Sequence, residues 1–136
     1  MSKRVLIVPC SGIGKSYGSV AREGAYGVTE DLCPEQTKLV PLALLVLGGN
    51  EAHSTMAGAK AITIDGCKLT CAAKVVAESG GTVAHAIDVP DVFRRHRDLK
   101  PSGIAELDQN GKKLARVLAE EVKELVDSMT GEDHHA

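Results

Sequence analysis

The sequence predicts an α/β protein, a three-layer sandwich around a mainly parallel sheet of four strands, with a fifth strand left open. Short aliphatic and β-branched runs alternate with segments whose apolar residues recur at the helical period of 3.6. Strands that alternate with helices usually form a parallel sheet that is covered on both faces. The 136 residues suffice for one domain, which we expect over residues 1–131, with a disordered tail over 132–136.

Four apolar runs are predicted to be strands. Each is rich in aliphatic or β-branched residues and is bounded by turn-forming residues or proline. In chain order they are residues 3–8, 38–47, 60–64 and 82–89. The second run contains Pro41, which fits near the start of a strand because proline has no backbone N–H to donate to a neighbouring strand.

Four segments are predicted to be helices. In chain order they are residues 15–32, 51–59, 67–79 and 105–129. Glycines at positions 18, 24 and 27 weaken the first, Gly80-Gly81 ends the third, and the fourth has one continuous apolar face. Residues 90–101, which precede the last helix, are interpreted as an irregular basic segment.

Composition argues against nucleic acid and membrane as partners. Sixteen basic and eighteen acidic residues give a net charge of -2, so the net charge of the protein does not favour binding to nucleic acid or to anionic lipid. No apolar stretch is long enough to cross a bilayer, and no signal-type segment precedes the first strand. We therefore expect a cytoplasmic protein. A homodimer formed through the last helix is left open, and the sequence indicates no other protein partner.

The four cysteines are the main candidates for a functional site. Cys67 and Cys71 stand four positions apart at the start of the third predicted helix, which puts both on one helix face. Cys10 follows the first strand as Cys67 follows the third, and in such sheets these two strands commonly lie side by side. Cys10 should therefore meet Cys67 at the carboxyl edge of the sheet. Clustered thiolates are typical zinc ligands, and Cys33, at a helix end, is the weakest candidate among them.

Two further features flank these cysteines. Ser11, Gly12 and Gly14 form a loop whose backbone N–H groups are candidates for binding an anion. The loop is not a Walker motif, because Pro9 stands where that motif needs glycine. Asp65, at the end of the third strand, is expected either to cap the following helix or to order the thiolate loop as a neighbour of the metal ligands.

These residues resemble the DGC domain, a family of small proteins proposed to bind zinc and named for an Asp-Gly-Cys signature. The matching segments are Cys10-Ser11-Gly12, residues 61–67 and Cys71-Ala72. The resemblance implies a zinc site of four cysteines, three of which correspond to Cys10, Cys67 and Cys71. The family's remaining cysteine is expected around residues 41–47, where this chain has none. Either Cys33 replaces it, or three thiolates leave one position open, as in catalytic zinc sites.

The leading interpretation is thus a zinc-binding protein for metal handling, sensing or accessory delivery, with a flavodoxin-like or Rossmann-like fold. The first alternative is a thiol-dependent enzyme, with Cys10 or Cys67 as nucleophile or redox group acting on a small anionic substrate. The second alternative is an iron-sulfur carrier, because four thiolates also suit a cluster. The sequence does not decide whether the protein is an enzyme.

Overall fold

The fold is built on a parallel sheet. The computed structural model describes residues 4–10, 16–66, 70–103 and 106–135, with side chains as far as residue 130. The described strands are β1 (Val5–Pro9), β2 (Thr37–Leu39), β3 (Lys60–Asp65) and β4 (Thr82–Asp88). They form one four-stranded sheet in the order β2-β1-β3-β4, and every pairing is parallel. The predicted α/β class is confirmed, and β1 lies beside β3 as expected.

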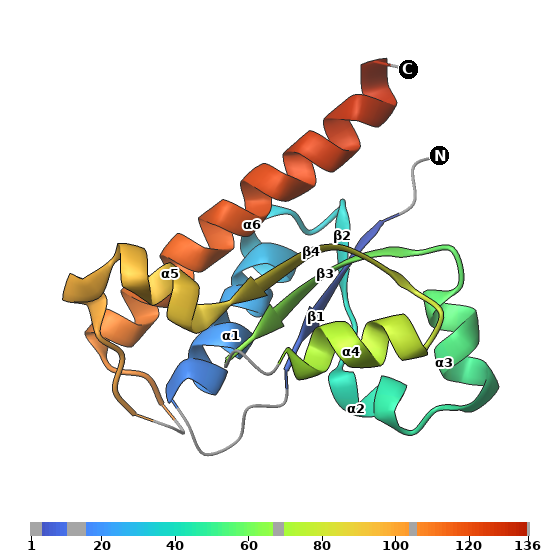
Figure 1. Ribbon diagram of the computed structural model, residues 1–136. Helices are drawn as coiled ribbons and strands as arrows, with labels where there is room; N and C mark the ends of the chain where they lie inside the picture. The colour runs from blue at the N-terminus through green and yellow to red at the C-terminus, as the bar shows by residue number, and fades with distance from the viewer. Residues whose placement is uncertain (1–3, 11–15, 67–69, 104–105, 136) are drawn as a thin grey trace.

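Helices cover both faces of the sheet and give three layers (Figure 1). One face is covered by α1 (Ser16–Tyr26), its continuation η1 (Gly27–Leu32) and α6 (Gln109–His135). The other is covered by α2 (Leu42–Val46), α3 (Gly49–Met56) and α4 (Cys71–Glu78). At the end of β4, α5 (Val89–Arg95) and η2 (Arg97–Leu99) connect the sheet to α6. Helix α6 is longer than predicted and continues past Met129 to His135. The predicted domain boundary at residue 131 and the disordered tail stay predictions.

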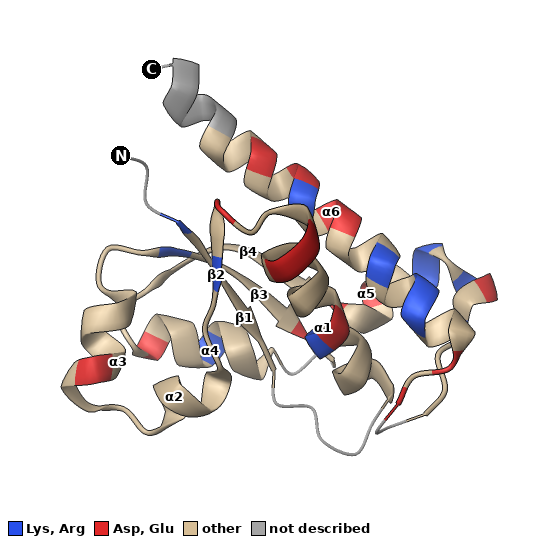
Figure 2. Cartoon of the chain, turned by 180° about the vertical axis from the view of Figure 1, so that it is seen from behind, with Lys and Arg blue, Asp and Glu red and all other residues tan. Residues whose placement is uncertain are grey.

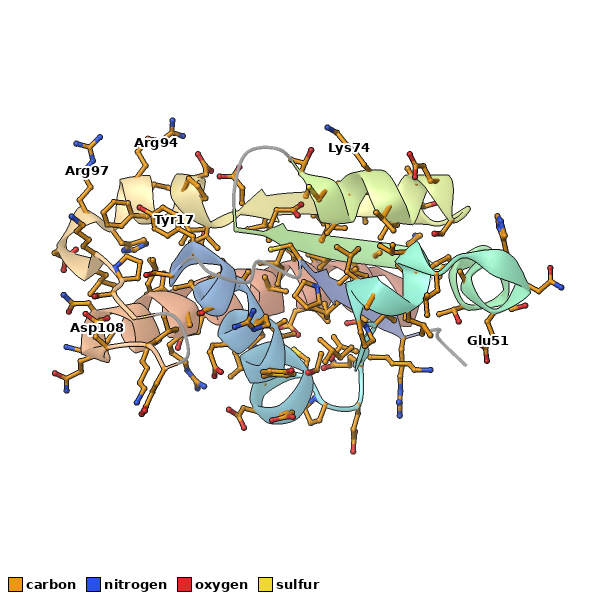
Figure 3. All side chains as sticks on the ribbon, turned by 90° about the horizontal axis from the view of Figure 1, so that it is seen from below. Tyr17, Glu51, Lys74, Arg94, Arg97 and Asp108 are labelled. Atoms are coloured by element: carbon orange, nitrogen blue, oxygen red, sulfur yellow. The ribbon has the colours of Figure 1, made fainter. Side chains whose placement is uncertain are left out.

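The core lies between the sheet and its helices. Every residue of β1 is buried, and β3 is buried after its first residue, which is why neither strand alternates between apolar and polar positions. Helix α6 adds a fully buried stripe at helical spacing, made of Leu114, Leu118, Val122 and Val126. Figure 3 shows apolar side chains filling the interior, while Glu51, Lys74 and Arg94 point outward.

The predicted second strand is wrong over most of its length. Only Thr37–Leu39 pairs with β1, and residues 42–46 form helix α2 instead. Pro41 precedes α2 and cannot donate a backbone hydrogen bond to a neighbouring strand. The leucines and alanine that follow are good helix formers, and Leu42 and Leu45 are buried at a three-residue spacing. A continuous apolar run here therefore belongs to a short helix on the sheet.

The predicted irregular basic segment is also wrong, because its first half is helix α5. Asp88 caps this helix: its Oδ1 atom accepts a hydrogen bond from the backbone N–H of Asp91 at 2.8 Å. Pro90 stands in the first turn, where no backbone N–H is needed. The last helix begins at Gln109 and not at residue 105, since the Asp108 carboxylate accepts from the backbone N–H of Gly111 at 2.8 Å.

Charges of both signs are mixed along the outer helices, as Figure 2 shows for α6. Two examples on that helix are the pairs Lys123–Asp127 at 2.7 Å and Arg116–Glu120 at 3.6 Å. None of the helices in the described part of the chain has the length and apolar composition to cross a bilayer. Self-association through α6 and the absence of a nucleic-acid partner stay predictions.

Candidate functional site

The carboxyl ends of β1 and β3 place Cys10 against the turn that follows β3. Pro9 pairs with Ile64, so Cys10 and Asp65 are the next positions along the two strands. The backbone N–H of Cys10 donates to the carbonyl of Ile64 at 2.9 Å. The Cys10 sulfur, 8 % exposed as a residue, accepts a hydrogen bond from the backbone N–H of Gly66 at 3.1 Å. Two chain segments 56 residues apart are thus joined through a sulfur atom.

Gly66 is required by close packing of two backbones. A Cβ atom at this position would lie 2.8 Å from the nitrogen and 2.9 Å from the Cα of Gly18, in the first half of α1. Real Cβ atoms do not approach backbone so closely, so only glycine lets the end of β3 lie against α1. The glycine of the Asp-Gly-Cys sequence therefore fixes how near Cys10, the turn and α1 lie to one another.

Asp65 is buried at the end of β3, with 1 % of its surface exposed. Its Oδ1 atom accepts a hydrogen bond from the backbone N–H of Ala72 at 2.9 Å. Asp65 therefore caps the start of α4, which is one of the two roles expected for it from the sequence. Its Oδ2 atom is buried and has no hydrogen-bond partner among the residues described. Burial raises the pKa of this carboxyl above its ordinary value, the N–H groups of Ala72 and Ala73 lower it, and the charge of Asp88 raises it.

Cys71 is the first residue of α4, and it is exposed. The residue before it, Thr70, has the left-handed φ angle of +53° that turns the chain into this helix. Through the Asp65–Ala72 hydrogen bond, the start of α4 is tied to the edge of the sheet that holds Cys10.

Cys33 lies at the opposite edge of the sheet. It comes just before β2, which pairs in parallel with β1, whereas Cys10 comes just after β1. Cys33 is buried, and its pKa is raised by burial and by the charge of Asp127, while the charge of Lys123 lowers it. The structure therefore brings Cys10 to the turn after β3 and does not bring Cys33 there.

The remaining predicted site residues lie outside the described part of the chain. They are Ser11, Gly12, Gly14 and Cys67. Among the residues that are described, no three cysteine, histidine or carboxylate side chains come together as a metal site. What the structure does give is the position of the groups on either side of Cys67, namely the Asp65-Gly66 turn and the first residues of α4.

Comparison with known families decides the classification. The family model of the DGC domain matches residues 6–128, which runs from β1 into the last turns of α6. The chain belongs to the DGC domain family. No curated protein and no solved structure matches it at a significant level. The DGC match covers the Asp65-Gly66-Cys67 signature together with Cys10 and Cys71.

One residue at the edge of the DGC sheet escaped the sequence analysis. Asp88 ends β4 and pairs in register with Asp65 at the end of β3. Its negative charge contributes to raising the pKa of Asp65. The rule that ligands bind at the carboxyl ends of parallel strands applies to the fourth strand as it does to the first and third. Applied to residue 88, that rule would have drawn attention to this carboxylate.

For the buried thiol of the DGC domain, we expect Cys33→Ala to flatten the loss of stability at alkaline pH. The raised pKa means that folded Cys33 keeps its proton in a pH range where the unfolded chain has lost it. Folding is then linked to proton uptake, and the free energy of unfolding falls as pH rises above the ordinary range of a thiol. Urea unfolding of metal-free protein from neutral to alkaline pH measures this slope. Asp127→Asn should give an intermediate slope, and equal slopes in all three proteins would contradict the prediction.

Proposed function

We propose that this protein binds a zinc ion through the thiolates of Cys10, Cys67 and Cys71 and serves in cytoplasmic metal handling, sensing or delivery. The main support is the hydrogen bond from the Gly66 backbone N–H to the Cys10 sulfur at 3.1 Å. A donor aimed at sulfur stabilises the thiolate, which is the form that binds metal. The same bond ties Cys10 to the residue that directly precedes Cys67 in the chain.

The groups at this edge of the sheet fit a soft divalent cation. Cys10 is buried, and Asp65 is a buried carboxylate whose pKa is raised by that burial. Negative groups out of water are costly unless a positive charge accompanies them. Zinc supplies that charge and prefers thiolate ligands in tetrahedral geometry. Because Cys33 lies at the other edge, the thiolates available here come from Cys10, Cys67 and Cys71.

The chain's own groups would hold and tune such a site. The Gly66 N–H orients the sulfur of Cys10, and the Asp65 carboxylate fixes the start of α4, where Cys71 stands. Contacts of this kind around metal ligands are known to affect metal affinity by one to two orders of magnitude. When bound, zinc would act as a structural centre or, with an open position, as a Lewis acid.

The test is the metal content of the protein purified without a metal-affinity tag, with Cys10→Ser, Cys67→Ser and Cys71→Ser beside it. We expect stoichiometric zinc in the wild type, lost in these variants because each removes one thiolate. Cys33→Ser is the matched control, since it changes a buried cysteine at the opposite edge and should keep its zinc.

Other results of this experiment identify the alternatives. A brown protein that contains iron and acid-labile sulfide would replace zinc binding with the iron-sulfur carrier. A metal-free wild type in which Cys10 or Cys67 is alkylated rapidly at neutral pH would replace it with the thiol-dependent enzyme. Zinc retained in all four serine variants would place the metal away from these cysteines.

A further inference from the structure

The outer edge of β4 has no neighbouring strand in the described part of the chain. β4 is the last strand in the order β2-β1-β3-β4, and it pairs with β3 alone. It is seven residues long, and Thr82, His85 and Ala86 are exposed. The register shift between β3 and β4 lies near the start of β4, so residues 85–88 form a regular edge. The backbone N–H and C=O groups of such an edge can pair with another extended chain.

β4 lacks the features that usually protect an edge strand. Natural edge strands are kept very short, or they carry lysine or proline. At the opposite edge, β2 has only three residues, and Pro41 follows it closely. Residues 82–88 contain no lysine, arginine or proline. An edge of this length without such protection is suited to the addition of a strand from a partner.

An acidic crevice adjoins the second half of this edge. It lies where β4 leads into α5, beside α6, and has a volume of about 280 Å³ (Figure 1). Its apolar surface comes from Ala86, Ile87 and Leu125. The charged side chains that line it from the described residues are four carboxylates and one guanidinium, namely Asp88, Asp91, Glu121, Glu124 and Arg95. This excess of negative charge favours a basic occupant.

The contacts of Arg95 leave part of this negative charge without a counterpart. Arg95 pairs with Glu121 and, at 3.8 Å, with Asp91. The Oε1 atom of Glu121 makes the first of these contacts, whereas its Oε2 atom is buried and accepts no hydrogen bond from any described residue. A buried carboxylate oxygen without a donor is costly, and a charged N–H group is the strongest donor that it can receive. A lysine or arginine side chain in the crevice would supply that donor.

We infer that the edge of β4 binds an extended segment of a partner protein, with lysine or arginine side chains over the carboxylates of the crevice. Main-chain hydrogen bonds to the edge hold the segment, and its alternate side chains point toward the crevice and give specificity. A second copy of this chain fits less well. A two-fold β4–β4 pair would set residues 86–88 opposite residues 82–84 of that copy, which carry no positive charge. The inference does not depend on metal binding.

The first test measures the binding of a short, blocked peptide of alternating lysine and valine to the full chain by calorimetry. We expect saturable binding that weakens as the salt concentration rises, because the charges at the rim are screened. A peptide with glutamate in place of lysine should bind at least about 10-fold more weakly. The lysine peptide with every backbone nitrogen methylated keeps its charge, lacks N–H donors, and should also lose at least about 10-fold. Absence of binding, or equal binding of either control peptide, would overturn the inference.

The second test locates the site with two variants of α6. Glu121→Gln and Glu120→Gln each remove one negative charge from a partly exposed side chain, but Glu120 pairs with Arg116 and does not line the crevice. Thermal unfolding checks that both variants are folded. Glu121→Gln should weaken binding of the lysine peptide about 10-fold, and Glu120→Gln less than about 2-fold. Equal effects of the two variants would overturn the inference.

Nuclear magnetic resonance of the same complex tests the contact with the strand directly. The backbone amide signals of residues 85–88 should shift when the lysine peptide binds, because their edge gains a neighbour. Those of residues 37–39, on the opposite edge of the sheet, are the control and should not shift. Binding that shifts only residues 37–39, or neither set, would overturn the inference.

Discussion

Gly66→Ala is expected to lower the free energy of unfolding by about 3 kcal/mol, at the upper end of the range for overpacking. The added methyl group would lie 2.8 Å from the backbone nitrogen of Gly18. Neither glycine can move alone, because Gly66 directly follows a buried strand and Gly18 lies inside α1. Relief would separate the turn from α1 and pull the Gly66 N–H away from the Cys10 sulfur. Chemical denaturation measures the stability, and chelator competition should show zinc affinity falling with it.

Gly24→Ala is the matched control for this prediction. A Cβ atom there would come even closer to a neighbour, 2.6 Å, but that neighbour is the Cδ2 atom at the far end of the Leu118 side chain. A side chain can rotate where backbone cannot, and alanine favours a helix over glycine by roughly 1 kcal/mol. Gly24→Ala should therefore lower the free energy of unfolding much less than Gly66→Ala does. If the two variants lose equal stability, backbone packing at Gly66 is not the cause.

Leu118→Ala is expected to lower the free energy of unfolding by about 2–5 kcal/mol, the range for leucines in well-packed cores. Leu118 is fully buried in the stripe that α6 presents to the core, where it packs on α1 at Gly24. Truncation leaves a cavity between the two helices that cover one face of the sheet. Val117→Ala is the control. Because Val117 is only partly buried, its truncation should lower the free energy of unfolding clearly less.

A double-mutant cycle sharpens this prediction. In the Leu118→Ala background, the atom that crowds position 24 is gone, and the methyl group of Gly24→Ala would fill part of the new cavity. Gly24→Ala should then be neutral or stabilising, although it is unfavourable in the wild type. The coupling between the two changes should be on the order of 1 kcal/mol, as for residues in direct contact. Additive effects in urea unfolding would contradict the packing described between α1 and α6.

The sequence predicted the structure best for the strands that are buried on both faces of the sheet. The short aliphatic runs of β1 and β3 are typical of strands buried in a parallel sheet. Because the first and third strands of such sheets commonly lie side by side, Cys10 was correctly expected beside the end of β3. The helix cap at Asp65 followed from residue type and position. That these groups bind zinc stays a prediction, and so does any role for Ser11, Gly12 and Gly14.

Where the sequence misled, tertiary packing decided between two local options. The run from residue 39 to 47 is almost wholly apolar, so its periodicity could not separate strand from helix, and Pro41, which stands between β2 and α2, made the difference. The arrangement of the candidate site also depends on tertiary structure that the local sequence does not show. Nothing local to Cys33 reveals that it precedes an edge strand at the far end of the sheet, and nothing local to Asp65 reveals an oxygen without a partner.

If the protein binds zinc as proposed, the hydrogen bond from Gly66 to Cys10 also has a consequence for when the chain can take up the metal. Cys67 and Cys71 are four positions apart in the chain, whereas Cys10 reaches the turn that precedes them only after β1 and β3 have paired, since Cys10 and Gly66 are 56 residues apart. An unfolded or partly synthesised chain can offer metal two thiols at most in this segment, and binding to it is correspondingly weak. Metal that prefers the folded form adds its binding energy to stability. If the chain binds zinc as proposed, occupancy would thus report that the first half of the protein has folded, and a nascent chain would be spared premature capture of zinc.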